Sequence, residues 1–265
     1  MLVLQSLLVA LFCVLGSVCT PFYGFTGGWY ILSRPLIGGF ICGIIFGDVT
    51  SGILMGVAIQ AAYLALVTPG GSFPAELGFI SYPVIAVALY SKIDTSLAVA
   101  LAATIGVLGT FVLTFTMSIN SVFSAMSDRA IEKGDIKGVT RSFLIYPQLL
   151  QLFTRGIPAF LAVYFGAQYI QNFLDMLPAW LITGLMSLGG LLPAVGIAVL
   201  LSQTVRNQSF ILFFLLGFLC CSVLGMDTIS ITIVACVIAL FYYRTSGVSG
   251  AKIDTNDQLA DEEVL

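Results

Sequence analysis

The stretch RPLIGGFICGIIFGDVTSGILMGVAIQAAYLALVTPGGSFPAELG, residues 34–78, decides the fold because it is apolar yet repeatedly interrupted. Two apolar runs, Pro35–Phe46 and Gly52–Val67, flank a polar break, and a Gly/Pro loop follows over residues 68–74. At about 1.5 Å per residue, neither run comfortably spans a hydrocarbon core of about 30 Å. Lipid cannot satisfy freed backbone groups, so such breaks occur where protein buries them or where they line a cavity. The stretch therefore predicts broken or re-entrant helices, a feature that often marks the binding site of a membrane transporter.

The composition places this stretch in a polytopic helical membrane protein. Of 265 residues, 59% are hydrophobic and only 9% are charged, whereas a soluble domain carries about 25% charged residues. The net charge of -3 has a local origin, because residues 252–265 hold five acidic side chains against one lysine. No basic patch or stripe indicates a nucleic-acid partner.

Cysteine and histidine usage excludes several kinds of site. The six cysteines lie in apolar surroundings without a CxxC pair, and the chain has no histidine. Packing is therefore the expected role of the cysteines, and no metal site is expected. The absence of histidine excludes Ser-His-Asp and Cys-His catalysis, an imidazole proton relay and a phosphohistidine on this chain.

Further apolar runs predict the remaining helices of a membrane domain over residues 1–245. They cover residues 2–18, 79–90, 96–116, 143–170, 178–201, 210–224 and 229–243. The first run lacks the features of a cleaved signal peptide, so we expect a retained helix. The basic cluster over residues 129–141 is expected on the cytoplasmic side, which also puts the C-terminus in the cytoplasm. Residues 246–265 are expected to form an acidic, disordered tail.

One arginine lies inside an apolar run. Gln148, Gln151 and Arg155 have i, i+3 and i+7 spacing, so they share one helical face. An arginine in such a segment usually faces protein or water. It could equally extend its charged head to the membrane surface from near a helix end, and the sequence leaves both interpretations open.

Several short motifs, in order, resemble a known family. They are RPLIGG, GIIFGD and GILMG, then Gln60, TPGGSFP and a late FFLLGF over Phe213–Phe218. Together they are similar to the membrane IIC subunit of the mannose/fructose/sorbose class of the bacterial phosphotransferase system, across residues 1–245.

The resemblance implies a multi-pass sugar permease (EIIC) of the bacterial cell (inner) membrane. Such a subunit works with a IID membrane subunit and with cytoplasmic IIA and IIB phosphocarriers, as a trimer of IIC/IID pairs in membrane lipid. The pair moves the sugar in elevator fashion, and IIB phosphorylates it at the cytoplasmic face. The phosphorylated groups of these systems belong to IIA and IIB, so the chain is expected to be no enzyme on its own and to need no cofactor.

The resemblance also implies a substrate-binding site in the interrupted stretch. Gln60 stands where mannose-type members commonly carry glutamate, and an amide both donates and accepts hydrogen bonds. The residues carried over are Asp48, Gln60, Thr68, Gly70, Gly71, Ser72 and Glu76. Each has a structural alternative: Asp48 could cap the helix that follows, Gln60 could bond another helix, Glu76 could lie in an interface loop, and the glycines could serve turns and packing.

Three other functions stay open on the residues alone. An ion-coupled secondary sugar transporter would bury a titratable carboxylate, for which Asp48 or Glu76 could serve. A membrane-embedded enzyme would need a nucleophile with a base or a metal cluster, neither of which the sequence offers. A structural partner subunit would leave the sugar to IID.

Overall fold

The computed structural model of the chain describes residues 1–17, 26–66, 75–205 and 211–246. These residues are largely helical, and no strand occurs among them, which confirms the predicted class. Contacts divide the chain into two compact units, Met1–Gln203 and Thr204–Leu265. This division was not predicted from the sequence. The predicted domain boundary at residue 245 stays a prediction. Ser246, the first residue of the predicted tail, belongs to α12, and residues 247–265 lie outside the described residues.

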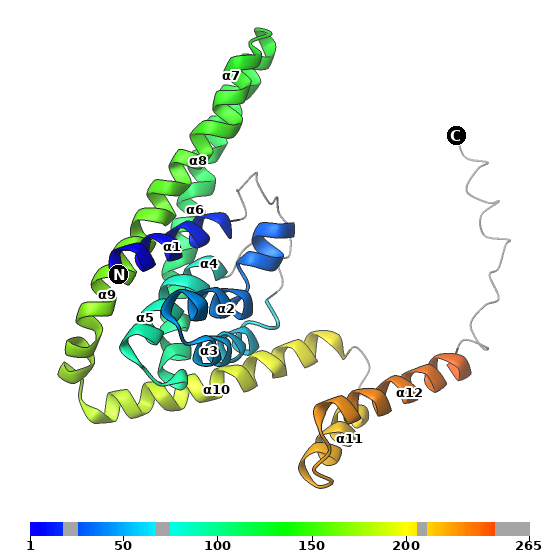
Figure 1. The fold of residues 1–265 in the computed structure, drawn as a ribbon. Coiled ribbons are helices and arrows are strands. Elements are labelled where there is room, and N and C mark those ends of the chain that lie inside the picture. Colours follow the sequence, from blue (N-terminus) through cyan, green and yellow to red (C-terminus); the bar gives the residue numbers. More distant parts are fainter. Residues whose placement is uncertain (18–25, 67–74, 206–210, 247–265) are drawn as a thin grey trace, which may run out of the picture. The chain divides into compact units, whose positions relative to one another are not determined.

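The first unit begins with short helices that correspond to the interrupted part of the sequence (Figure 1). The predicted run Pro35–Phe46 is one helix, as expected, and the second run begins three residues earlier than predicted. In chain order these elements are α1 (Leu2–Leu15), the π-helical segment η1 (Thr26–Leu32), α2 (Pro35–Phe46), α3 (Val49–Ala62), α4 (Leu77–Phe79), the π-helical segment η3 (Ile80–Val84) and α5 (Ile85–Ser91).

Long helices complete the first unit. In the part of the chain that the structure describes, three helical stretches are long and apolar enough to cross a membrane, over Thr95–Glu132, Ile136–Ile170 and Ala179–Gln203. The elements are α6 (Thr95–Glu132), α7 (Ile136–Thr140), η4 (Arg141–Ile145), α8 (Tyr146–Gln151), η5 (Leu152–Gly156), α9 (Ile157–Met176) and α10 (Ala179–Thr204), with π-helical geometry in η4 and η5.

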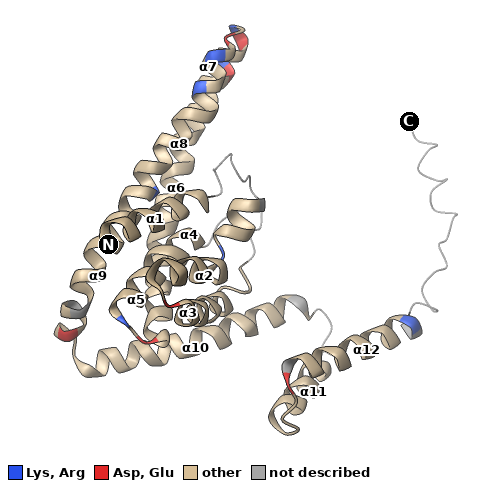
Figure 2. Ribbon diagram, viewed as in Figure 1, with Lys and Arg blue, Asp and Glu red and all other residues tan. Residues whose placement is uncertain are grey.

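Helix α6 is longer than the membrane requires. Its 38 residues extend about 57 Å at 1.5 Å per residue, against a hydrocarbon core of about 30 Å. Helices α7 and α8 run back beside it, and charged residues gather at the α6–α7 turn (Figure 2). Gly134 forms this turn with φ +68°. The charged end therefore lies beyond the hydrocarbon core.

The core of the first unit forms where α1, α2, η3, α5 and α9 meet the first turns of α6. Small residues on α6 let these helices approach closely. Two of the six cysteines, Cys13 and Cys42, are buried there as free thiols, which agrees with the packing role expected for them. The core includes Val9, Cys13, Trp29, Cys42, Ile59, Tyr82, Ile85, Ala98, Ala159 and Val163.

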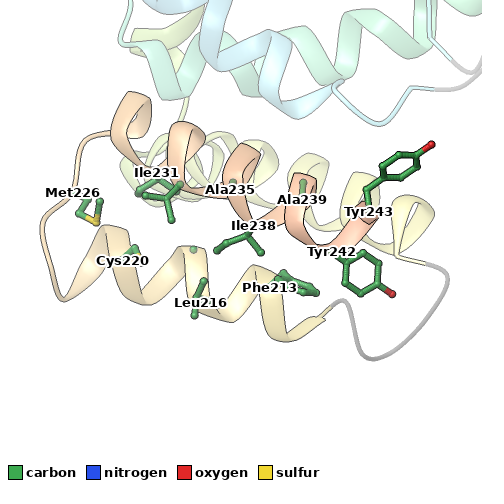
Figure 3. A pocket seen from close by; sticks show the side chains of 12 residues that line it. Phe213, Leu216, Cys220, Met226, Ile231, Ala235, Ile238, Ala239, Tyr242 and Tyr243 are labelled. Carbon is green, nitrogen blue, oxygen red and sulfur yellow. The ribbon is translucent and has the colours of Figure 1, made fainter. Parts of the chain in front are cut away.

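The second unit contains two helices in its described part, α11 (Ile211–Ser222) and α12 (Thr228–Ser246). They pack side by side around an open groove of about 820 Å³ (Figure 3). The groove is lined by aliphatic and aromatic side chains, with the hydroxyls of Tyr242 and Tyr243 at one end. It lacks the convergent polar groups that would bind a polar ligand.

Candidate functional site

Helices α2 and α3 form a tight hairpin through facing glycines. A Cβ at Gly43 would lie 2.7 Å from the Cα of Val49, and a Cβ at Gly56 would lie 2.5 Å from the Pro35 carbonyl oxygen. Any larger side chain at these positions would force the two backbones apart. Gly47, at the turn, has φ +81°, a backbone region that glycine enters without steric cost. The GxxxG-like spacing in the sequence thus produces the close backbone packing of the hairpin.

Asp48 follows this turn and caps α3. Its Oδ1 accepts a hydrogen bond from the Ser51 N–H at 3.1 Å. This is the structural role that the sequence left open as an alternative, and it explains why α3 begins at Val49. The Ser51 hydroxyl, followed by the Ser51 N–H, holds the pKa of the exposed Asp48 carboxyl below its usual range.

The turn end of the hairpin borders a polar pocket of about 700 Å³. Lys92 and Asp94 come into this pocket from the α5–α6 connection, which the sequence analysis did not place near Asp48. Asp94 caps α6 by accepting the Ser96 N–H at 2.9 Å. The polar residues of the lining are Gln5, Asp48, Ser51, Tyr90, Lys92, Asp94 and Thr95.

Gln60 lies at the other end of α3. Twelve residues separate it from Asp48, which corresponds to about 18 Å along the helix axis. The hairpin therefore places the two predicted site residues too far apart for one monosaccharide to contact both. Gln60 is half-buried, and its Oε1 is a buried acceptor with no hydrogen-bond partner among the described residues.

Glu76 is fully buried in the first unit. Its Oε1 accepts the Gly78 N–H at 3.2 Å, which caps α4, and forms an ion pair with Nη2 of Arg155, itself only 1% exposed. Its Oε2 is buried and has no hydrogen-bond partner among the described residues. The sequence left open that Glu76 is a loop residue at the interface; the structure has it directly before α4 and buried inside the first unit.

Arg155 is the residue of this cluster that sequence reasoning did not assign. The sequence left two positions open for it, facing protein or reaching to the membrane surface, and the structure has it inside the protein. Gln151, one turn earlier, is also fully buried. Two polar residues with i, i+4 spacing in an apolar segment were the available signal.

Helix α6 brings the end of α3 and the start of α4 together. A Cβ at Gly106 would lie 2.9 Å from the Tyr63 hydroxyl and 2.7 Å from Cδ1 of Ile80. A Cβ at Gly109 would lie 2.8 Å from Cβ of Glu76. Since three residues rise by about 4.5 Å, Tyr63 and Glu76 both approach one turn of α6.

The segment that joins these two points contains four predicted site residues. Thr68, Gly70, Gly71 and Ser72 lie outside the described residues. Among the predicted residues that are described, Gln60 and Glu76 flank this segment on the same side of the hairpin, whereas Asp48 lies at the opposite end. No group of three or more Cys, Asp or Glu side chains that could hold a metal ion occurs in the described part of the chain.

Comparison with known proteins identifies the family. The family model for "PTS system sorbose-specific iic component" matches residues 3–241. The N-acetylgalactosamine permease IIC component 1 of Escherichia coli is 29% identical over 189 residues, covering 71% of this chain and 70% of the relative. The mannose-specific EIIC component of the phosphotransferase system of Escherichia coli is 28% identical over 219 residues, covering 80% of each.

A solved structure has the same fold. The mannose transporter ManYZ, determined in complex with a microcin, contains a chain that aligns with a TM-score of 0.54 and 22% sequence identity. The alignment covers 92% of this chain and 94% of that one. The family match over most of the chain, the helical membrane fold and these relatives lead to one conclusion. The chain belongs to the family of sorbose-specific IIC components, the sugar-permease subunits of the mannose class of the bacterial phosphotransferase system.

Proposed function

We propose that this permease subunit binds its sugar between the end of α3 and the start of α4, with Gln60 and Glu76 as hydrogen-bonding partners. The observation that carries the proposal is a pair of buried acceptor oxygens, Gln60 Oε1 and Glu76 Oε2, without hydrogen-bond partners among the described residues. Leaving such atoms unsatisfied costs about 1–3 kcal/mol each, and more for a charged group. Sugar hydroxyls are donors that can satisfy both.

The loop between these residues completes the proposed site. Thr68 and Ser72 supply hydroxyls, and Gly70 and Gly71 let backbone groups approach a ligand. A few convergent polar groups in apolar surroundings are typical of small-molecule sites. The relatives named for N-acetylgalactosamine and mannose favour a neutral hexose or N-acetylhexosamine as the substrate.

Asp48 requires a separate position in this proposal. It lies about 18 Å from Gln60 along α3, beside the polar pocket at the hairpin turn. A sugar bound near Gln60 cannot also contact Asp48, so Asp48 could contact the sugar only at a second binding position along the translocation pathway. The capping hydrogen bond to the Ser51 N–H is sufficient to explain why an aspartate occurs at this position, without a second sugar position.

We further propose that the chain works in a complex. A IID membrane subunit shares the translocation pathway, IIA and IIB carry the phosphoryl group, and IIC/IID pairs assemble as a trimer in the bilayer. The elevator motion carries the sugar to IIB, and the charged α6–α7 turn and the C-terminus lie on the cytoplasmic side. The excess of basic over acidic side chains at that turn supports this orientation.

Transport in membrane vesicles tests the proposal. The vesicles contain this chain with its IID, IIA and IIB partners and the general phosphocarriers. Radiolabelled N-acetylgalactosamine, mannose, sorbose and fructose are offered with phosphoenolpyruvate or with an imposed proton gradient. We expect sugar phosphate to accumulate only with phosphoenolpyruvate. Free sugar that accumulates with the gradient would contradict the proposal and indicate ion-coupled transport.

A further inference from the structure

We infer that Arg155 is a positioning residue for sugar recognition, acting through the carboxylate of Glu76. The inference rests on the proposed function, because it assigns Glu76 to the sugar. Arg155 Nη2 and the Gly78 N–H both engage Oε1 of Glu76. The carboxylate is thereby held in one orientation, and Oε2 is left as the acceptor that can receive a sugar hydroxyl.

Arg155 is held from several directions. Its Nη1 donates to the carbonyl oxygen of Cys13 on α1 at 3.5 Å, and its guanidinium lies 6.0 Å from the centre of the Phe79 ring. It belongs to η5, and π-helical turns inserted in α-helices are frequent at functional sites. Contacts with α1 and α4 therefore hold the guanidinium in the position from which it orients Glu76.

Glycines make room for this cluster. A Cβ at Gly78 would lie 3.2 Å from both Arg155 Nη1 and Glu76 Oε1, and a Cβ at Gly109 would lie 2.8 Å from Cβ of Glu76. The cluster is thus closely packed on two sides by backbone that carries no side chain. This packing restricts the rotation of the Glu76 side chain.

A contribution to folding stability does not by itself explain why the protein contains this buried ion pair. Desolvation of two buried charges roughly cancels their attraction, so two well-packed neutral side chains can be as stable. Removal of only one partner is strongly destabilising, because it leaves an unpaired buried charge. Ionisable residues inside membrane proteins are accordingly most often functional. A positioning role gives the pair a function that neutral side chains cannot supply.

The exchange of arginine for lysine separates positioning from charge. Lysine keeps the positive charge but lacks the planar fork that orients a carboxylate. We expect Arg155→Lys to insert into the membrane with its IID partner at the normal level. The apparent KM for the best-transported of the four sugars should rise about tenfold or more, with a smaller change in the maximal rate, as for a lost charge-assisted hydrogen bond. Arg141→Lys, at an exposed arginine of η4, is the matched control and should leave KM unchanged.

The double variant Glu76→Gln with Arg155→Gln tests the same inference without an unpaired charge. It should assemble with IID and resist heat about as well as the wild type, while its KM stays raised about tenfold or more. A normal KM in the double variant, or in Arg155→Lys, would overturn the positioning role and leave the pair a structural one.

A Gln60→Leu variant distinguishes the failure of this inference from the failure of the proposed site. If Gln60→Leu raises KM and Arg155→Lys does not, the site stands and the positioning role is wrong. If neither substitution changes KM, the proposed site itself is wrong. If vesicles with the wild-type chain show no phosphoenolpyruvate-dependent transport, the proposed complex is contradicted instead.

Discussion

Replacing Gly52 by alanine should loosen the α2–α3 hairpin. The new Cβ would lie 2.9 Å from the Cα of Gly43 and 3.1 Å from its nitrogen, and closer still to the carbonyl oxygen of Gly39. All three are backbone atoms, so no side chain can rotate away and the helices themselves must separate. Overpacking of this kind costs about 1–3 kcal/mol of the free energy of unfolding.

The same substitution at Gly190 is the matched control. Gly190 is exposed on α10, and a Cβ there would meet no atom within 4 Å. Alanine is favoured over glycine inside a helix by about 1 kcal/mol, so Gly190→Ala should be neutral or slightly stabilising. The same helix preference applies to Gly52 inside α3, so it cancels between the two variants. Gly52→Ala should therefore be less stable than Gly190→Ala by the overpacking cost of about 1–3 kcal/mol.

Thermal unfolding of the purified IIC/IID pair in detergent measures this difference. At about 2–4 °C per kcal/mol for a chain of this size, Gly52→Ala should lower Tm by several degrees. It should also reduce sugar uptake, because a displaced α3 moves Gln60 relative to α6. Equal Tm values for Gly52→Ala and wild type would refute the close packing of the hairpin.

Three further changes have defined outcomes. Gln60→Leu should abolish uptake at low sugar concentration without changing membrane insertion or IID pairing. Gln168→Leu, on the exposed side of α9, is the control and should leave uptake unchanged. Normal uptake by Gln60→Leu would rule out the assigned site. Asp48→Ala should lower Tm at pH 7. Because the folded-state pKa is lowered, the capping contribution is fully present above the unfolded pKa of about 3.9 and is lost as pH falls from there through the folded-state pKa. A Tm difference that does not shrink as pH is lowered below about 3.9 would contradict capping by the carboxylate. Deletion of residues 252–265 should barely change transport rates, and a severe loss would count against a disordered tail.

The hydropathy pattern and the turn residues of the sequence were sufficient to predict where helices form. The runs of apolar residues predicted α2 with its observed bounds, and a glycine, Gly134, lies at the turn after α6. These features are local, because the length of an apolar run and the conformational freedom of a glycine act over a few neighbouring residues. The family was also recognisable from short motifs in their order along the chain.

The arrangement of the site was only partly predictable. The family resemblance assigned Asp48, Gln60 and Glu76 together to one site within the interrupted stretch. A helix of fourteen residues nevertheless separates its two ends by about 20 Å. Whether Asp48 contacts a sugar stays a prediction, as does the role of the loop over residues 67–74, which lies outside the described residues.

By itself, the sequence determined that this protein is a helical membrane protein with broken helices in its N-terminal third, because hydropathy and backbone breaks depend on local composition. Only the tertiary structure decided that Arg155 pairs with Glu76, 79 positions away. The apolar run around Arg155 fits both a buried arginine and one that reaches the membrane surface. The choice between them depends on which helices pack around it, and the small residues of α6 that permit this packing act between segments far apart in the chain.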